Sequence, residues 1–283
     1  MYPVLLSFGD HAASSWHVLL VLAMALSCGL AFWLRDRIDL SRRRLGLFCA
    51  LAAVFGVLGA KLGHCLLEAP GHLLDDGRVT TGVGDLLAAD PWHWTHLLDG
   101  GYVWYPGLLL AALGVVLLAR ALRQPLWPLA DLLVLVLPFG MATGRLGCFL
   151  AGCCHGAATD LPWAVSFGAG PGAGLGPVHP TQLYEAVLDL GLGVTLLLQR
   201  RGLAHAGLSS ARFLVLSGGI RFALEFWRGD LERGVWFDGL FSSSQALALL
   251  SMVAGGVLLW YVSPSRDART RTRPDIAQEV AAR

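Results

Sequence analysis

The chain has 283 residues, of which 55% are hydrophobic and only 14% charged, and its formal net charge is +1 at pH 7. Soluble globular domains carry about 25% charged residues, so this composition excludes an ordinary soluble domain. The nearly balanced charge gives no sign of a nucleic-acid partner. Several apolar runs of about 20 residues, which is enough to cross a bilayer, favour a polytopic helical membrane protein.

In chain order, the sequence predicts an all-α fold of about seven transmembrane helices. The expected spans are residues 16–34, 45–67, 102–121, 127–150, 183–198, 211–227 and 240–262. We expect residues 1–262 to form a single transmembrane domain with longer polar loops at about 68–101 and 151–182. The remaining residues, 263–283, are basic and polar, which predicts a disordered tail.

The distribution of basic residues predicts the orientation of these spans. Fifteen of the 21 Lys and Arg residues fall in alternate loops and in the C-terminal tail. Because cytoplasmic loops are rich in Lys and Arg, this bias places the tail in the cytoplasm and the N-terminus in the periplasm. The loops at 68–101 and 151–182 are then periplasmic, and the expected location is a bacterial inner membrane.

Three charged residues lie close together in the predicted sixth span, at Arg221, Glu225 and Arg228. Their spacings of four and three residues place them on one helical face. One interpretation is a buried ion pair that only fixes helix packing. The other is an anion site, because two guanidinium groups around one carboxylate leave positive charge for a phosphate or a lipid headgroup.

A second charged position, Arg145, lies near the end of the fourth span, within the sequence GRLG. An arginine at membrane depth costs roughly 2.5–3.5 kcal/mol on insertion scales, so it usually faces a cavity or a partner. A snorkelling arginine at the interface is the simpler alternative. The polar loop that follows at once favours the functional interpretation, and we expect Arg145 and Arg221 to belong to one site.

Three cysteines, Cys148 at the end of the fourth span and Cys153 and Cys154 in this loop, precede His155. The spacing is not a standard zinc pattern, and adjacent cysteines rarely both bind one ion. We therefore predict no metal and no cofactor. Packing of small side chains, a disulfide in an oxidising periplasm and a reactive thiol remain open.

The loop ends at His179 and Pro180, directly before the fifth span. Thr181 is placed like a helix N-cap, and Glu185 follows one position beyond a standard capping box. Helix-start chemistry therefore explains Thr181. It does not explain why Gln182 and a tyrosine, Tyr184, enter a membrane segment beside a histidine.

These motifs resemble those of the prolipoprotein diacylglyceryl transferase family. GRLGCFLAGCCHG resembles the family signature GR(L/I)GNF(I/L)NGExxG, and DLPWAVSF with HPTQLYEA is similar to DLPWGVVF with HPSQLYEA. GGIRFALEFWRGD resembles FRFxxEFxRxD. The resemblance covers about residues 16–260, and the motifs occur in the same order.

The resemblance implies a seven-span inner-membrane enzyme that moves the diacylglyceryl group of phosphatidylglycerol onto the cysteine thiol of a prolipoprotein lipobox. It implies catalytic roles for two arginines, Arg145 and Arg221. It also implies that the substrates are bound by Arg145, Gly156, Gln182, Tyr184, Glu185, Glu225 and Arg228. The arginines would stabilise the leaving phosphate, and a base would generate the thiolate.

The chain departs from the family pattern at positions that carry polar groups. Tyr105, a further candidate catalytic residue, stands where the family motif HGGL has a histidine that is a candidate base. Cys148 and Cys153 replace the signature asparagine and glutamate. His155 or His179 could supply the missing base. These changes leave two alternatives open, a phospholipid-dependent transferase with another acceptor and a non-catalytic lipid-binding protein on the same scaffold.

Overall fold

A computed structural model describes residues 4–8, 11–35, 38, 40–67, 103–170, 172–199, 206–229, 235–236 and 241–262. The predicted loop at 68–101 and the predicted tail at 263–283 lie outside these residues. The chain divides into two compact units, one of Met1–Ile38 with Trp127–Arg283 and one of Asp39–Leu126. A single transmembrane domain over residues 1–262 stays a prediction.

The fold is helical, as the sequence predicts. The first unit contains α1 (Ser15–Leu34), α6 (Leu126–Ala151), α7 (Thr181–Gln199), α8 (Leu208–Leu224) and α9 (Ser243–Val262), and the second contains α2 (Arg42–Leu67) and α5 (Trp104–Ala121). In the described residues, six helices are long and apolar enough to cross a membrane. The predicted sixth span is the exception, because α8 has 17 residues and continues as the 3-10 turn η3 (Glu225–Trp227).

Two short hairpins add strands that the sequence analysis does not predict. β1 (Val4–Phe8) pairs with β2 (His11–Ser14), and β3 (Val235–Trp236) pairs with β4 (Phe241–Ser242), both antiparallel. α1 follows β2 directly, and the Ser14 side chain caps it by accepting a hydrogen bond from the His17 backbone at 3.4 Å. Ser14 therefore fixes where the first hairpin ends and the first span begins.

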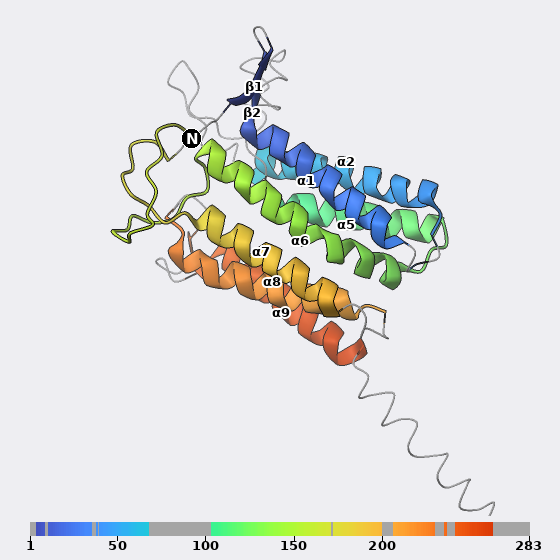
Figure 1. The fold of residues 1–283 in the computed structure, drawn as a ribbon. Coiled ribbons are helices and arrows are strands. Elements are labelled where there is room, and N and C mark those ends of the chain that lie inside the picture. The colour runs from blue at the N-terminus through green and yellow to red at the C-terminus, as the bar shows by residue number, and fades with distance from the viewer. Residues whose placement is uncertain are drawn as a thin grey trace, which may run out of the picture. The chain divides into compact units, whose positions relative to one another are not determined.

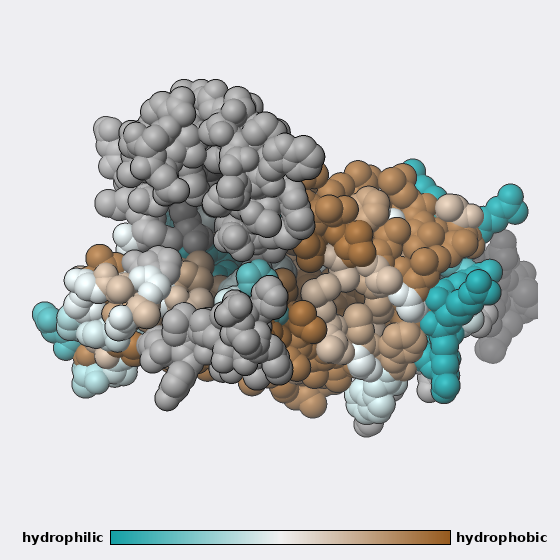
Figure 2. Space-filling model, turned by 90° about the horizontal axis from the view of Figure 1, so that it is seen from above, coloured by the Kyte–Doolittle hydropathy of each residue, from teal (hydrophilic) through white to brown (hydrophobic). Residues whose placement is uncertain are grey.

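The surface of the helices matches a membrane environment. Large apolar side chains such as Val187, Leu198 and Trp260 are 69%, 76% and 66% exposed. Figure 2 shows apolar residues covering much of the described surface that faces the viewer. Contiguous apolar surface on this scale is typical of contact with lipid. The orientation of the spans across the membrane stays a prediction.

Small residues bring the helices of the first unit close together. A Cβ added to Gly140 of α6 would lie 2.5 Å from the Ser27 hydroxyl of α1, and one added to Gly193 of α7 would lie 2.8 Å from the Phe139 ring of α6. α7, α8 and α9 continue this packing side by side (Figure 1). Close packing through small residues is usual between membrane helices, and here it brings the charged ends of α6, α7 and α8 together.

Candidate active site

An ion-pair network joins the charged side chains of three helices. The Arg145 Nε of α6 lies 2.8 Å from the Glu185 Oε2 of α7, and the Arg221 Nη1 of α8 lies 3.5 Å from the other oxygen, Oε1. Arg221 also contacts Glu225 at 2.6 Å between Nη2 and Oε2. The structure therefore unites Arg145 and Arg221 in one site, as the sequence analysis expects, and Glu185 is the carboxylate that bridges them.

The network is largely shielded from solvent. The Glu185 and Glu225 side chains are 5% and 8% exposed, and those of Arg145 and Arg221 are 21% and 13% exposed. Arg221 also donates a hydrogen bond from Nη2 to the Ser244 hydroxyl of α9 at 3.2 Å. Charges buried this deeply must be paired, so removing any one of them leaves an uncompensated partner.

The net charge of this site is closer to zero than the sequence suggests. Two carboxylates, Glu185 and Glu225, face the two guanidinium groups of Arg145 and Arg221. Arg228 adds a third positive charge that acts electrostatically on Arg221. Any anion that enters the site would therefore share these guanidinium groups with the carboxylates.

The loop between α6 and α7 is held by side chains at the start of α7. Gln182 Nε2 donates to the Cys153 carbonyl at 2.6 Å, and Thr181 Oγ1 donates to the Cys154 carbonyl at 2.9 Å. The Thr181 hydroxyl thus bonds to the loop, which corrects the simple helix-cap interpretation. Gln182 is completely buried, and among the residues that the structure describes its Oε1 has no hydrogen-bond partner.

Gly156 joins this loop to the segment that follows α8. Its backbone N–H donates to the His179 carbonyl at 2.8 Å, and it pairs with Arg228 in an isolated antiparallel bridge. An added Cβ would lie 2.5 Å from both the His179 Cβ and the Trp227 carbonyl oxygen. The structure therefore gives Gly156 a packing role, and substrate binding by this residue stays a prediction.

The two histidines lie in separate surroundings. His179 Nδ1 is 3.3 Å from the Tyr184 hydroxyl, which also accepts a hydrogen bond from Trp163 Nε1 at 2.7 Å. His155 Nδ1 is 3.1 Å from the Gly156 carbonyl oxygen. In the described part of the chain, neither histidine forms a hydrogen bond or ion pair with Arg145 or Arg221. A role as base therefore stays a prediction for both.

Tyr105 lies in the first turn of α5, in the other compact unit. Its predicted catalytic role also stays a prediction.

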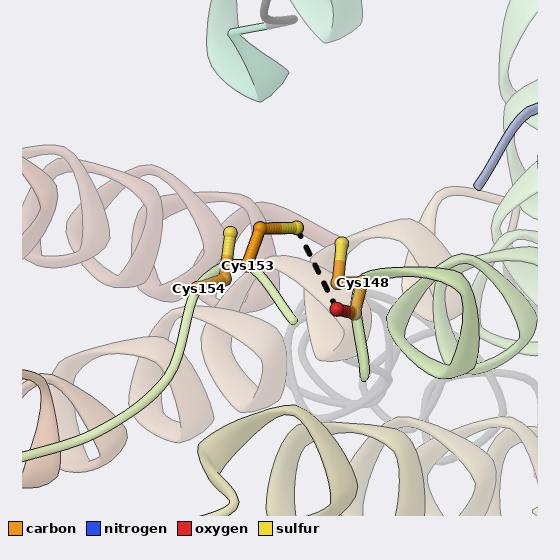
Figure 3. Close-up of side chains that lie close together, drawn as sticks. All are labelled: Cys148, Cys153 and Cys154. Atoms are coloured by element: carbon orange, nitrogen blue, oxygen red, sulfur yellow. Dashed lines mark hydrogen bonds between the residues drawn. The ribbon is translucent and has the colours of Figure 1, made fainter. Parts of the chain in front are cut away.

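The three cysteines form a compact cluster at the C-terminal end of α6. The sulfur atoms of Cys148, Cys153 and Cys154 all lie within 4.8 Å of one another, and Cys153 Sγ donates to the Cys148 carbonyl at 3.6 Å (Figure 3). Hydrogen bonds from Cys148 and Cys153, together with Arg228 and Arg145, hold the pKa of the Cys154 thiol well below its usual value. The pKa of Cys153 is raised by its hydrogen bonds to the same two neighbours.

Asp189 is a site residue that the sequence analysis missed. It is 2% exposed on α7, one turn after Glu185, and interacts electrostatically with Arg145 and Arg221. A signal was present, because a carboxylate in an apolar span is unusual and the spacing of four residues from Glu185 puts both on one face.

Comparison with known proteins shows the family of the whole chain. The family model described as LGT, prolipoprotein diacylglyceryl transferase, matches residues 3–261. The chain belongs to the prolipoprotein diacylglyceryl transferase family. The family resemblance drawn from the sequence motifs is therefore confirmed, and the chain is a member of a transferase family.

Several curated relatives carry the name phosphatidylglycerol–prolipoprotein diacylglyceryl transferase. The protein of Verminephrobacter eiseniae is 36% identical over 80% of this chain and 74% of its own length. That of Allorhizobium ampelinum is 30% identical over 96% of this chain and 92% of its own. For the protein of Aeromonas salmonicida, with 34% identity, the match spans 62% of this chain and 63% of the relative.

Proposed function

We propose that this chain transfers the diacylglyceryl group of phosphatidylglycerol to the thiol of a prolipoprotein lipobox cysteine, in a bacterial inner membrane. The observation that carries the proposal is the buried network of Arg145, Glu185 and Arg221. These residues come from three different helices and occupy motif positions of a family whose named relatives catalyse this transfer.

The chemistry requires a carbon–sulfur bond to form while a carbon–oxygen bond breaks. The thiolate sulfur attacks the glyceryl carbon next to the phosphate, and the electron pair of the broken bond passes to the leaving phosphate oxygen. That oxygen gains negative charge in the transition state, so guanidinium groups fixed in advance stabilise it. We assign this role to Arg145 and Arg221.

The apolar surface of the helices fits the proposed substrates. One substrate is a phospholipid and the other is a membrane-tethered protein, so both reach the site from the bilayer. The headgroup would lie near the ends of α6, α7 and α8, with Gln182, Tyr184, Glu225 and Arg228 as further binding residues. The acyl chains would lie along exposed apolar side chains of the kind seen at Val187 and Leu198.

Replacement of Arg221 by alanine tests the proposal. We expect Arg221→Ala to lose the transfer of diacylglycerol to a lipobox peptide in phosphatidylglycerol vesicles by about 100-fold or more, because a preorganised charge donor is removed. Mass spectrometry of the peptide measures the product.

Arg212→Ala is the matched control on the same helix, because Arg212 is outside the network and bonds to Gln199 at 2.8 Å. We expect this variant to keep wild-type transfer. Full activity in a folded Arg221→Ala protein would refute the proposed role of the network.

A further inference from the structure

The cysteine cluster has the donor set of a site for a soft metal ion. Three sulfur atoms, from Cys148, Cys153 and Cys154, converge from the end of α6 and the loop that follows it (Figure 3). Thiolate ligands select soft ions such as Zn(II) and Cu(I) over hard ions such as Mg(II). We propose that these three cysteines bind one soft d10 metal ion, with Zn(II) as the ion that fits the geometry described below.

The distances are close to those that an ion requires. For Zn–S bonds of about 2.3 Å in a tetrahedral site, two sulfur atoms lie about 3.8 Å apart. The three sulfur atoms here all lie within 4.8 Å of one another. Small side-chain rotations therefore suffice to bring the cluster to bonding distance, and the three cysteines are only partly buried, so an ion can enter.

The backbone around the cluster is held in place by buried side chains. The Cys153 and Cys154 carbonyls accept hydrogen bonds from Gln182 and Thr181, which are both fully or almost fully buried. Cys154 itself has a positive φ of 60°, which is uncommon for a residue other than glycine and turns its side chain relative to that of Cys153. This conformation resolves the objection that adjacent cysteines rarely bind one ion together.

A three-sulfur site leaves one coordination position of zinc open. Catalytic zinc sites have three protein ligands and an exchangeable fourth position, whereas structural sites have four protein ligands. In the described residues, the metal-ligating cluster contains these three cysteines and no fourth donor. The open position would accept a thiol from outside the protein, and each thiol that binds releases its proton to solvent.

The binding of a thiol at the open zinc position rests on the proposed function, because the incoming lipobox cysteine would supply that thiol. Coordination to zinc deprotonates a thiol outright. A zinc ion at this cluster would therefore generate the attacking thiolate in a chain that has Tyr105 where the family motif has a candidate histidine base. The cluster lies next to Arg145, which acts electrostatically on Cys148 and Cys154.

Metal content of the full-length protein tests the site without any activity assay. The protein is purified in detergent under reducing conditions, incubated with zinc, desalted and measured by elemental mass spectrometry. We expect about one zinc ion per chain in the wild type, because metal binding to a preformed thiolate site is strong. We expect Cys153→Ala to lose at least about tenfold in bound zinc for the same reason.

Two further variants keep the test decisive. Cys28→Ser, in α1, removes a cysteine outside the cluster and should keep the wild-type zinc content. Cys148→Asn with Cys153→Glu introduces the residues of the family signature, so it should fold and yet lose zinc. Equal zinc in all variants, no zinc in the folded wild type, or a disulfide within the cluster that survives reduction would each overturn the proposal.

Replacing zinc with Co(II) tests whether a thiol binds at the open coordination position, independently of lipid transfer. A tetrahedral Co(II)–thiolate site absorbs visible light, and its spectrum should change when a cysteine lipobox peptide is added but not with the matching serine peptide. An unchanged spectrum with both peptides would overturn the open position. A changed spectrum in a protein that transfers no lipid would support the metal site while refuting the proposed function.

Discussion

Glu185 is the residue on which the charge arrangement of the site depends. Its two oxygens face different guanidinium groups, Arg145 at 2.8 Å and Arg221 at 3.5 Å, and its side chain is 5% exposed. It therefore offsets part of the positive charge of the two arginines and fixes their separation. A phosphate that enters the site must compete with this carboxylate, so Glu185 sets how strongly the arginines hold a headgroup.

Removing the charge of Glu185 should destabilise the folded protein. Glu185→Gln leaves two buried guanidinium groups without their shared counter-charge, which costs about 3–5 kcal/mol for a buried pair. Thermal unfolding in detergent should show a lowered midpoint. The exposed Asp160→Asn makes the same chemical change on the surface and should shift stability by less than about 0.5 kcal/mol. Equal midpoints for the two variants would contradict the bridging role.

Among single residues, Arg145 and Arg221 were easier to predict from the sequence than the contacts that their side chains make. Arg145 and Arg221 were recognisable because a charge in an apolar span is unusual, and the motif order pointed to one shared site. The bridge through Glu185, the nearby Asp189 and the Ser244 hydrogen bond depend on how α6, α7, α8 and α9 pack. Spacing along one helix cannot show contacts between helices.

Among the secondary-structure elements and loops, the loop between α6 and α7 connects the cysteine cluster with the helices that carry the charged residues. It is joined to α7 through Thr181 and Gln182, and to the segment after α8 through the Gly156 backbone. These contacts hold the cysteine cluster beside the end of α6, which carries Arg145. The position of the arginines and that of the cysteines are therefore set by the same loop.

Gly156→Ala should loosen this connection. The added methyl group would meet the His179 Cβ and the Trp227 carbonyl oxygen at 2.5 Å, and overpacking of this kind costs about 1–3 kcal/mol. Limited proteolysis of the purified protein should show faster cleavage in the loop. Gly168→Ala, where an added Cβ meets nothing within 4 Å, should behave as the wild type. Equal cleavage of both variants would contradict the packing role.

The helices were predictable because each one is a long apolar run, and most predicted ends fall within a few residues of those observed. α2 starts at Arg42, earlier than predicted, because the arginine-rich loop itself enters the helix and the Ser41 hydroxyl accepts a hydrogen bond from the Arg44 backbone. The β3–β4 hairpin was not predictable, since its two strands have two residues each and carry no alternation to recognise.

For the whole molecule, the predicted orientation places the site at the periplasmic face. The Lys and Arg bias puts the loop after the first span in the cytoplasm and the segment at 68–101 on the other side. Reporter fusions at Arg43 and Asp85 should report cytoplasm and periplasm, respectively. The reverse pattern would place the network and the cysteine cluster on the cytoplasmic side and contradict the orientation.

The most direct test of the proposed activity is the mass of a lipobox peptide after incubation with the wild-type protein and phosphatidylglycerol vesicles. We expect a gain of one diacylglyceryl group on the cysteine sulfur, and no gain on a matched peptide with serine at that position. No gain on the cysteine peptide, from folded protein in phosphatidylglycerol vesicles, would contradict the proposed diacylglyceryl transfer.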